Sequence, residues 1–431
     1  MQHKHRIAIT GIGIVSPLGT ERQTTWEHLM QARSGVDRIT HFDASRFPTQ
    51  VAAEVKNFKP TYFLSPKLKQ QVVPFVSYAL QAATEAFEDA GMSPTDETSE
   101  RWGLVVGSGM MTAEFHYWQK FQQAYAKEGI VDFEAMREHF KPGFYKSADF
   151  CKTLPNSGLG LLLQHFHIRG YATSVHTACA SGGQALGLAL RAMRRGEVDY
   201  MLAGGFDSMI NPIGVASFCL LGAMSTHNDP PEAASRPFDK TRNGFILGEG
   251  AAFLILESFE HAKARGARIY AELAGEGNSM SAYRITDSHP SGDGAIQAIR
   301  GGLQDAHVSV NEVTHINAHA TGTQMNDLSE TNAIKAVFGA RAKEIPISGC
   351  KSLTGHLIAG AGALEAAITA LSIYYSKIPM TAHLTSFDPA CDLDYVSEGV
   401  RTQAISVAVS NSFGFGGSNS CLVFKHPEYE G

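Results

Sequence analysis

Short apolar runs alternate with longer segments of helical periodicity along nearly the whole chain. The expected strands lie at residues 6–10, 103–107, 200–203, 251–256, 270–275, 315–318, 345–349 and 404–409. The expected helices lie at residues 76–90, 181–195, 259–265, 294–306, 328–338 and 360–375. Several strand runs are continuously apolar, as in strands that are covered on both faces. The alternation predicts an α/β architecture with mostly parallel sheets.

The chain is long enough to require more than one hydrophobic core. It has 431 residues, whereas a single core stops growing at roughly 250–300 residues. Two strand candidates each run into a Gly-x-Gly pattern, at Gly11-Ile12-Gly13 and at Gly275-Glu276-Gly277. The similarity favours two related halves, which we expect at residues 1–257 and 258–431.

Charge and cysteine usage narrow the class of protein. The chain carries 36 basic and 42 acidic residues, a net charge of −6, which argues against a general nucleic-acid-binding surface. The six cysteines, at positions 151, 179, 219, 350, 391 and 421, form no CxxC pair and indicate free thiols in a reducing cytoplasm. The apolar N-terminal run is interrupted by Thr10, Gly11 and Gly13, which favours a buried strand over a signal peptide. We find no continuous apolar stretch of membrane-spanning length and expect no membrane span.

Three other patterns carry little functional signal. Gly11-Ile12-Gly13 lacks the third glycine of a dinucleotide fingerprint, so we interpret it as a structural turn. His315 and His319 have the spacing of metal ligands on a helix, but the segment is predicted to be a strand, in which residues four apart lie far from each other. No HExxH pattern follows. We therefore expect no metal. No GxSxG motif of a serine hydrolase occurs.

The strongest chemical signal is the segment VHTACASGG at residues 175–183. A strand-like run ends at Cys179, and a helix follows it at once. A cysteine at a helix N-terminus experiences the positive end of the helix dipole, which lowers the pKa of the thiol and favours the thiolate. The pattern is typical of a nucleophile, and a buried inert cysteine is the equally weighted alternative.

Three further segments favour the nucleophile. They are NAHATGT at 317–323, KSLTGH at 351–356 and NSFGFGGSN at 411–419. Each contains glycine and lies near the end of an expected strand. Any one of them could be a packing feature, but packing alone does not explain all of them together.

Together with TGIGIVSPLG at 10–19 and SRPFDKTRNGF at 235–245, these segments resemble the elongating β-ketoacyl-[acyl-carrier-protein] synthases of the thiolase superfamily. The resemblance covers essentially the whole chain. It implies a thiolase fold of two related halves in a layered α-β-α-β-α arrangement, and a cytoplasmic acyltransferase. The HATGT form followed by Asn326-Asp327 leans towards the ketosynthase subunits of type II polyketide synthases, whereas fatty-acid elongation remains the other pathway.

The resemblance also implies residue roles. Cys179 would accept an acyl group as a thioester, and His319 and His356 would hold the thioester carbonyl of a malonyl unit. Lys351, with Glu330 as its acidic partner, would tune and hold the histidines. The backbone N–H groups of Cys179 and Phe415 would form an oxyanion hole, with Phe415 as a gate. The substrate-contacting positions would be Thr286, Thr321 and Thr323 for the phosphopantetheine arm, and Met110, Phe218 and Phe413 for the acyl pocket.

The resemblance implies no cofactor of the chain's own, because the phosphopantetheine arm of an acyl carrier protein brings the substrates. The chain would bind that carrier and form a homodimer, or a heterodimer with a chain-length-factor homologue. Five positions depart from the family pattern. Ala320 replaces a usual glycine, and Met110 and Met111 are bulkier than usual. Gln70 and Gln71 replace a basic pair that docks the carrier, which leaves Lys67 and Lys69 as the expected docking residues.

Other functions remain open at this stage. The chain could be a non-catalytic chain-length-factor-like partner, although such proteins have lost the nucleophile that Cys179 supplies. It could be a thiolase-type acyltransferase, although those use a second cysteine in the loop that here holds Phe415. A carrier-binding scaffold without turnover would form no acyl-enzyme.

Overall fold

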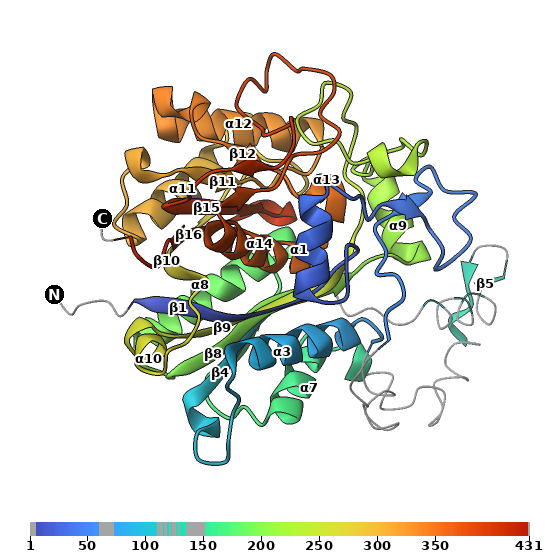
Figure 1. Cartoon of the computed structure of the whole chain (residues 1–431). Helices are drawn as coiled ribbons and strands as arrows, with labels where there is room; N and C mark the ends of the chain where they lie inside the picture. Colours follow the sequence, from blue (N-terminus) through green and yellow to red (C-terminus); the bar gives the residue numbers. More distant parts are fainter. Residues whose placement is uncertain are drawn as a thin grey trace.

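Five layers of helices and sheets make up the chain (Figure 1). The computed structural model describes residues 6–59, 73–109 and 151–429, and positions 115, 119, 122, 126–127 and 130–134 between them. Helices α3 and α7 cover one outer face, and α11 and α12 cover the other. The main sheet has ten strands, and its two halves, which meet at β10 and β1, form two layers with helices α8 and α14 between them. The expected α-β-α-β-α arrangement of a thiolase fold is confirmed.

The elements divide between two halves of the chain. The first half contains β1 (Ile7–Val15), α1 (Arg22–Met30), α3 (Val76–Ala90), β4 (Trp102–Ser108), α7 (Ser157–Phe166), β7 (Ala172–Val175), α8 (Ser181–Arg194), β8 (Tyr200–Ser208), α9 (Pro212–Leu220) and β9 (Glu249–Ser258). Helix α10 (Phe259–Ala264) follows. The second half contains β10 (Ala271–Met280), α11 (Asp293–Asp305), β11 (His315–Asn317), α12 (Gln324–Phe338), β12 (Ile347–Ser348), α13 (Lys351–Thr354), α14 (Ala361–Tyr375), β15 (Val407–Phe413) and β16 (Ser418–Lys425).

Three small strand pairs lie outside the main sheet among the described residues. They are β2 (Asp37–Arg38) with β3 (Val51–Ala52), β5 (Ala126–Lys127) with β6 (Ile130–Val131), and β13 (Lys377–Ile378) with β14 (Arg401–Thr402).

The order of the ten main strands repeats itself about the centre of the sheet. The order is β12-β11-β15-β16-β10-β1-β9-β8-β4-β7. The two middle strands, β10 and β1, are antiparallel to each other, and moving outwards each side has the same sequence of antiparallel and then parallel neighbours. This symmetry shows two related halves. The boundary at 257/258 stays a proposal, and it falls at the last residue of β9.

The sheet is mixed, so the expectation of mostly parallel strands is wrong in detail. Strands β15 and β16 are joined by a tight turn, and a short connection can link only antiparallel neighbours. Strand β9 likewise runs antiparallel to both β8 and β1. The parallel pairs are confined to the outer strands of each half, where β4 and β11 each lie between two parallel neighbours.

Both Gly-x-Gly patterns lie within strands, so the structural turn that we expected at Gly11-Ile12-Gly13 is wrong. Strand β1 continues through Gly13, and β10 continues through Gly277. A Cβ atom on Gly13 would lie 1.8 Å from the carbonyl oxygen of Ala82 in α3, and one on Gly277 would lie 2.1 Å from that of Ala298 in α11. Glycine is therefore required in both halves because the outer helix packs directly on the strand backbone.

The central helices bring the functional segments of the two halves together. A Cβ atom on Gly182 would lie 2.6 Å from the backbone nitrogen of Ala363, so the first turns of α8 and α14 are in close contact. The segment Ile358–Tyr375 is long and apolar enough to cross a membrane, but 89% of it is buried inside the protein, where α14 packs between the sheets. The N-terminal ends of α8 and α14 therefore lie side by side, with Cys179 directly before α8.

Candidate active site

Cys179 lies in a tight turn between β7 and α8. The turn is the 3₁₀ segment Ala178–Ala180, in which Ala178 has a left-handed φ of 48°. The Ser181 hydroxyl accepts from the Thr177 N–H at 2.8 Å and donates to the Ala178 carbonyl at 2.7 Å. These bonds close the turn and hold Cys179 at the start of α8, where it is buried.

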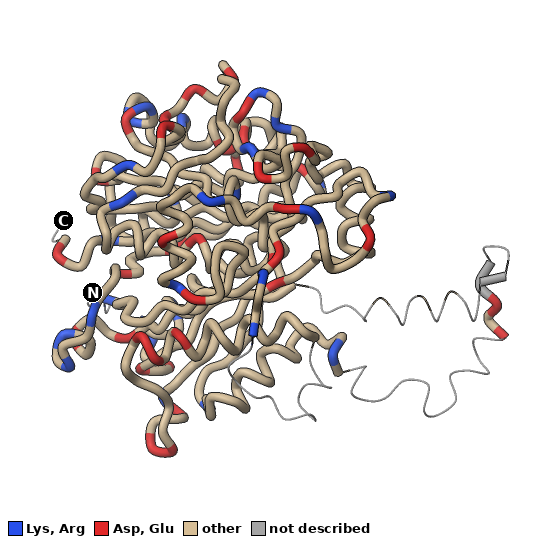
Figure 2. The backbone as a smooth tube through the Cα atoms, turned by 45° about the vertical axis from the view of Figure 1, so that its right-hand side comes forward, with Lys and Arg blue, Asp and Glu red and all other residues tan. Residues whose placement is uncertain are grey.

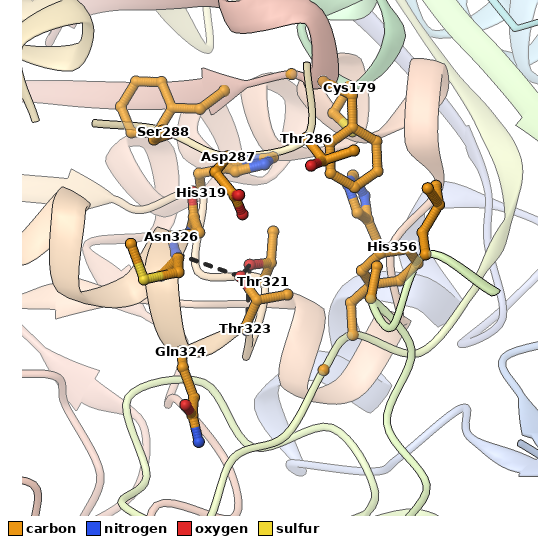
Figure 3. A pocket seen from close by; sticks show the side chains of 18 of the residues that line it. Cys179, Thr286, Asp287, Ser288, His319, Thr321, Thr323, Gln324, Asn326 and His356 are labelled. Carbon is orange, nitrogen blue, oxygen red and sulfur yellow. Dashed lines mark hydrogen bonds between the residues drawn. The ribbon is translucent and has the colours of Figure 1, made fainter. Parts of the chain in front are cut away.

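The two predicted histidines meet Cys179 from the other half of the chain. His319 follows β11, and His356 lies between α13 and α14. Their ring centroids are 5.3 Å apart at an interplanar angle of 82°. The Cys179 sulfur and one ring nitrogen from each histidine lie within 4.8 Å of one another. Figure 3 shows the three side chains around the same cavity.

The hydrogen bonds of His356 determine which ring nitrogen carries the proton. The Ile358 N–H donates to Nδ1 at 3.2 Å, so Nδ1 accepts and Nε2 carries the proton of the neutral ring. Burial, helped by the charge of Lys351, lowers the pKa of His356 well below its ordinary value. Nε2 is buried and has no hydrogen-bond partner among the described residues. His356 therefore offers an unused N–H donor inside the site.

Lys351 holds His319. Its Nζ lies 3.2 Å from Nδ1 of His319 and donates to the His319 carbonyl oxygen at 2.6 Å. An ammonium group can only donate, so Nδ1 is an acceptor and Nε2 carries the ring proton. Burial and the positive charge of Lys351 lower the pKa of His319 well below its ordinary value. A hydrogen bond from the His319 ring to the Phe413 backbone acts in the opposite direction. Both rings are thus neutral at neutral pH, and of the two N–H donors only that of His356 is without a partner among the described residues.

The acidic partner of Lys351 is Glu365, and our expectation of Glu330 is wrong. Both side chains of the Lys351–Glu365 ion pair are buried. Glu365 lies on α14, whose neighbouring residues are small or apolar. A single carboxylate in such a helix was the sequence signal that could have identified it, since acidic residues are rarely fully buried without a partner.

Glu330 accepts hydrogen bonds from the backbone of the His319 segment. Its carboxylate accepts from the N–H of His319 at 2.8 Å and from that of Ala320 at 2.9 Å, and also from the Asn411 side-chain amide at 3.2 Å. Burial raises its pKa to about 7. Ala320 has a left-handed φ of 46°. This conformation costs conformational energy in a residue with a side chain, so glycine would adopt it more easily than alanine does.

Burial raises the pKa of the Cys179 thiol to about 11, which corrects the expected lowering. The thiol is surrounded by protein, and desolvation disfavours the thiolate. The charge of Lys351 and the backbone N–H groups of Phe415 and of Cys179 itself act in the opposite direction. The short 3₁₀ turn, with α8 beginning two residues later, does not outweigh desolvation. The two N–H groups expected to form an oxyanion hole both point towards this sulfur.

A cavity of about 460 Å³ extends from the buried Cys179 to side chains that are exposed to solvent. It is lined by all three predicted threonines, Thr286, Thr321 and Thr323, and by Phe413. The hydroxyls of Thr321 and Thr323 are 3.0 Å apart (Figure 3). Phe218 does not line the cavity and instead stacks on Phe415, with ring centroids 6.2 Å apart. Lys67, Lys69, Gln70, Gln71, Met110 and Met111 lie outside the described residues.

Phe415 lies in the turn between β15 and β16, close to the Cys179 turn. A Cβ atom on Gly414 would lie 2.8 Å from the Thr177 carbonyl oxygen and 3.2 Å from the Cys179 nitrogen. Gly416 and Gly417 have positive φ angles of 82° and 85°. Glycine is needed at 414 for the close approach and at the other two positions for the conformation.

The cluster of Cys179, His319 and His356 has the residue types of a metal site, but its charge does not suit one. The Lys351 ammonium lies against His319 and would repel a cation. His315 lies apart from this cluster, in the core, with Nε2 3.0 Å from the Ser348 hydroxyl. The arrangement instead combines one nucleophile with two N–H donors.

A second thiol for thiolase chemistry does not reach the site. Cys421 lies on β16, and a Cβ atom on Gly302 of α11 would be 3.1 Å from its sulfur. Its side chain therefore faces the outer helix layer and not the cavity.

Profiles of the β-ketoacyl synthase N-terminal and C-terminal domains match residues 4–262 and 270–385. The chain belongs to the β-ketoacyl synthase family. The 3-oxoacyl-[acyl-carrier-protein] synthase 2 of Coxiella burnetii is 40% identical over 422 residues, covering 98% of this chain and 99% of the relative. The protein of the same name from Vibrio harveyi is 37% identical, with coverage of 98% and 99%.

Solved structures of the family agree with this assignment. A β-ketoacyl synthase from Burkholderia phymatum superimposes with a TM-score of 0.87 at 33% identity, covering 98% of this chain and 99% of that chain. A type II polyketide ketosynthase, in complex with its acyl-carrier protein and bound to a hexaketide, has a TM-score of 0.86 at 32% identity, with the same coverage. The expected β-ketoacyl synthase activity, an acyltransferase activity in chain elongation, is confirmed.

Proposed function

We propose that this synthase joins an acyl group held on Cys179 to a malonyl unit carried by an acyl carrier protein, with loss of carbon dioxide. The product is a β-ketoacyl thioester on the carrier, in the elongation of a fatty-acid or polyketide chain. The observation that carries the proposal is the unpartnered Nε2–H of His356 beside the His319 ring and the Cys179 sulfur. Two neutral imidazole donors at that position suit an oxygen that becomes negatively charged.

Acylation comes first. The Cys179 sulfur attacks the thioester carbonyl of the incoming acyl carrier, and the carrier thiol leaves with the proton that the cysteine loses. The backbone N–H groups of Cys179 and Phe415 stabilise the oxyanion of the tetrahedral intermediate. Their action on the Cys179 sulfur supports this role. A thiol suits this step because it is both a good nucleophile and a good leaving group.

Condensation follows in the same cavity. The malonyl carbon–carbon bond breaks, carbon dioxide leaves, and the electron pair forms an enolate whose oxygen accepts from His319 and His356. The enolate carbon attacks the acyl carbonyl, and the Cys179 thiolate is expelled and takes a proton from solvent water. Lys351 and Glu330 are positioning residues, because Lys351 fixes the His319 ring and Glu330 fixes its backbone.

We further propose a cytoplasmic dimer that binds an acyl carrier protein. Strand β7 supports the dimer because it is an edge strand that pairs only with β4 among the described strands. A second strand, from another copy or from a chain-length-factor homologue, can extend the sheet there. A solved ketosynthase/chain length factor for ishigamide has a TM-score of 0.85 with this chain at 33% identity.

Mass spectrometry of the Cys179 peptide tests the proposal. Incubation with acyl-loaded carrier protein should add the acyl mass to that peptide. No adduct with short, long or unsaturated acyl groups would contradict the role of Cys179. Cys179→Gln should abolish condensation and retain decarboxylation of the malonyl carrier, whereas a non-catalytic partner would show neither activity in the native chain.

A further inference from the structure

Asp207 is a buried carboxyl group near the active site that the proposed mechanism does not use. It lies near the end of β8, and its side chain is fully buried. Its Oδ2 accepts from the N–H of Ala359 at 3.1 Å, whereas Oδ1 has no hydrogen-bond partner among the described residues. Because acidic residues are rarely fully buried without a partner, a carboxyl group at this place indicates a role beyond packing.

The charge of Asp207 does not explain its presence. Figure 2 shows Lys and Arg interspersed with Asp and Glu along the described chain. At Asp207, burial raises the pKa of the carboxyl group to about 7, and only the backbone N–H groups of Ala359 and Ser208 act against this. A negative charge on Asp207 also raises the pKa of the Cys179 thiol, which disfavours the nucleophile. The useful feature of Asp207 is therefore its hydrogen bond.

The Ala359 N–H belongs to the turn that follows His356. This turn is the 3₁₀ segment Ile358–Gly360, directly before α14. Ile358 has a left-handed φ of 47°, which is unfavourable for a β-branched side chain and persists only where the surroundings hold it. The Ile358 N–H donates to Nδ1 of His356 at 3.2 Å. The strained residue is thus the one that sets the position of the proton on His356.

Asp207 reaches this turn from the other half of the chain. The N–H that it binds belongs to the peptide bond between Ile358 and Ala359, so the hydrogen bond restrains the orientation of Ile358. A Cβ atom on Gly360 would lie 3.3 Å from the Asp207 nitrogen, so the turn also packs on the backbone of β8. On the other side, a Cβ atom on Gly109 would lie 2.2 Å from Oδ2. The carboxyl group is therefore confined in the position that meets the turn.

We propose that Asp207 is a positioning residue for His356. By accepting from the Ala359 N–H, it holds the strained Ile358 turn in place. The turn then keeps Nδ1 of His356 an acceptor and leaves Nε2–H free for the enolate oxygen. The inference rests on the proposed function, in which His356 is one of the two donors. An amide oxygen can accept the same hydrogen bond, so the role belongs to the acceptor and not to the charge.

Two substitutions of similar shape separate the acceptor from the charge. Asp207→Asn keeps an acceptor oxygen and removes the charge, whereas Asp207→Leu removes both. Malonyl and hexanoyl groups on a bacterial type II acyl carrier protein are the substrates. Carbon dioxide release measures malonyl decarboxylation, and intact-protein mass measures acylation of Cys179. Since both variants lack the charge, their comparison removes its effect on the thiol.

Glu85→Met is the matched control. Burial also raises the pKa of Glu85 to about 7, and its carboxyl group accepts from the backbone N–H groups of Ile14 and Arg22. Glu85 lies on α3, in the outer helix layer. Its substitution removes a buried acceptor of backbone N–H groups at a place that does not contact the His356 turn.

Relative to Asp207→Asn, Asp207→Leu should lower the ratio of decarboxylation to acylation about 10–100-fold, the order expected when a catalytic group is displaced by about 1 Å. Asp207→Asn should decarboxylate at the native rate, and Glu85→Met should keep the native ratio. Equal ratios in the two Asp207 variants would overturn the inference, because they would show that the acceptor does not matter or that both half-reactions depend on it only through the fold.

The protonated nitrogen of His356 gives a second readout that needs no turnover. In ¹⁵N-histidine NMR, the His356 signals are identified by their loss in His356→Ala. They should place the proton on Nε2 in the native chain and in Asp207→Asn, and partly on Nδ1 in Asp207→Leu. A proton on Nδ1 in the native chain would overturn the inference even if Asp207→Leu does not fold. A native decarboxylation rate in His356→Ala would instead contradict the proposed function.

Discussion

Nζ of Lys351 lies 3.2 Å from Nδ1 of His319 and donates to the carbonyl oxygen of the same residue at 2.6 Å. A single ammonium group thus fixes both the ring and the backbone of the histidine. The same group forms a buried ion pair with Glu365. The position of one donor in the site therefore depends on a charge pair that bridges α13 and α14.

Removing one partner of this pair should separate stability from activity. Lys351→Met leaves the Glu365 carboxylate buried without its cation and should lower the free energy of unfolding by about 3–5 kcal/mol. Lys351→Met combined with Glu365→Leu should recover most of that loss, because no charge remains buried. Neither variant should decarboxylate malonyl carrier at the native rate, since His319 loses its fixed tautomer. Denaturant unfolding and carbon dioxide release measure the two quantities, and recovery of activity in the double variant would contradict the role of Lys351.

His356 should matter for decarboxylation and little for acylation. Its free Nε2–H is directed at the proposed enolate site, so His356→Ala should reduce malonyl decarboxylation about 10²–10³-fold, as for other lost oxyanion donors. Acylation of Cys179 uses backbone donors and should fall far less. Equal losses in both half-reactions, measured by carbon dioxide release and by intact-protein mass, would argue for a structural role only.

The Cys179 thiol should be mostly protonated at neutral pH. Burial raises its pKa to about 11, so the thiolate fraction, and with it the rate of alkylation by iodoacetamide, should rise about tenfold per pH unit from pH 7 to pH 10. Peptide mass spectrometry follows the reaction at this site alone, and Cys179→Ser provides the background from the other thiols. A rate that levels off near pH 7 would show a lowered pKa and would favour the expectation from the sequence.

Gly414 should be intolerant of a side chain. A Cβ atom there would lie 2.8 Å from the Thr177 carbonyl oxygen and 3.2 Å from the Cys179 nitrogen, so Gly414→Ala should displace the Phe415 N–H from the sulfur. We expect acylation to slow at least tenfold, which corresponds to about 1.4 kcal/mol of lost transition-state stabilisation. Gly160→Ala is the control, because no atom lies within 4 Å of a Cβ atom at Gly160. Native acylation rates in both variants would show that the turn tolerates displacement.

Much of the fold followed from periodicity in the sequence. The helix expected at 76–90 has those bounds in the structure, and five other expected helices are present with ends shifted by a few residues. The ends of the strands were predicted less accurately, since β1 and β15 extend well beyond the expected runs. Their later residues include Gly11, Gly13, Ser410 and Ser412, which lack strand propensity and are held in the sheet by their neighbours.

The kinds of group in the site could be predicted from sequence patterns alone: one cysteine before a helix, two histidines in glycine-containing segments, a lysine and a glycine-rich turn. Tertiary structure decided how they act. Whether Lys351 pairs with Glu330 or Glu365 depends on how α13 packs against α14, which no local pattern encodes. Whether the thiol pKa rises or falls depends on how fully segments far apart in the chain exclude water from Cys179, and desolvation outweighed the local helix effect that the sequence suggested.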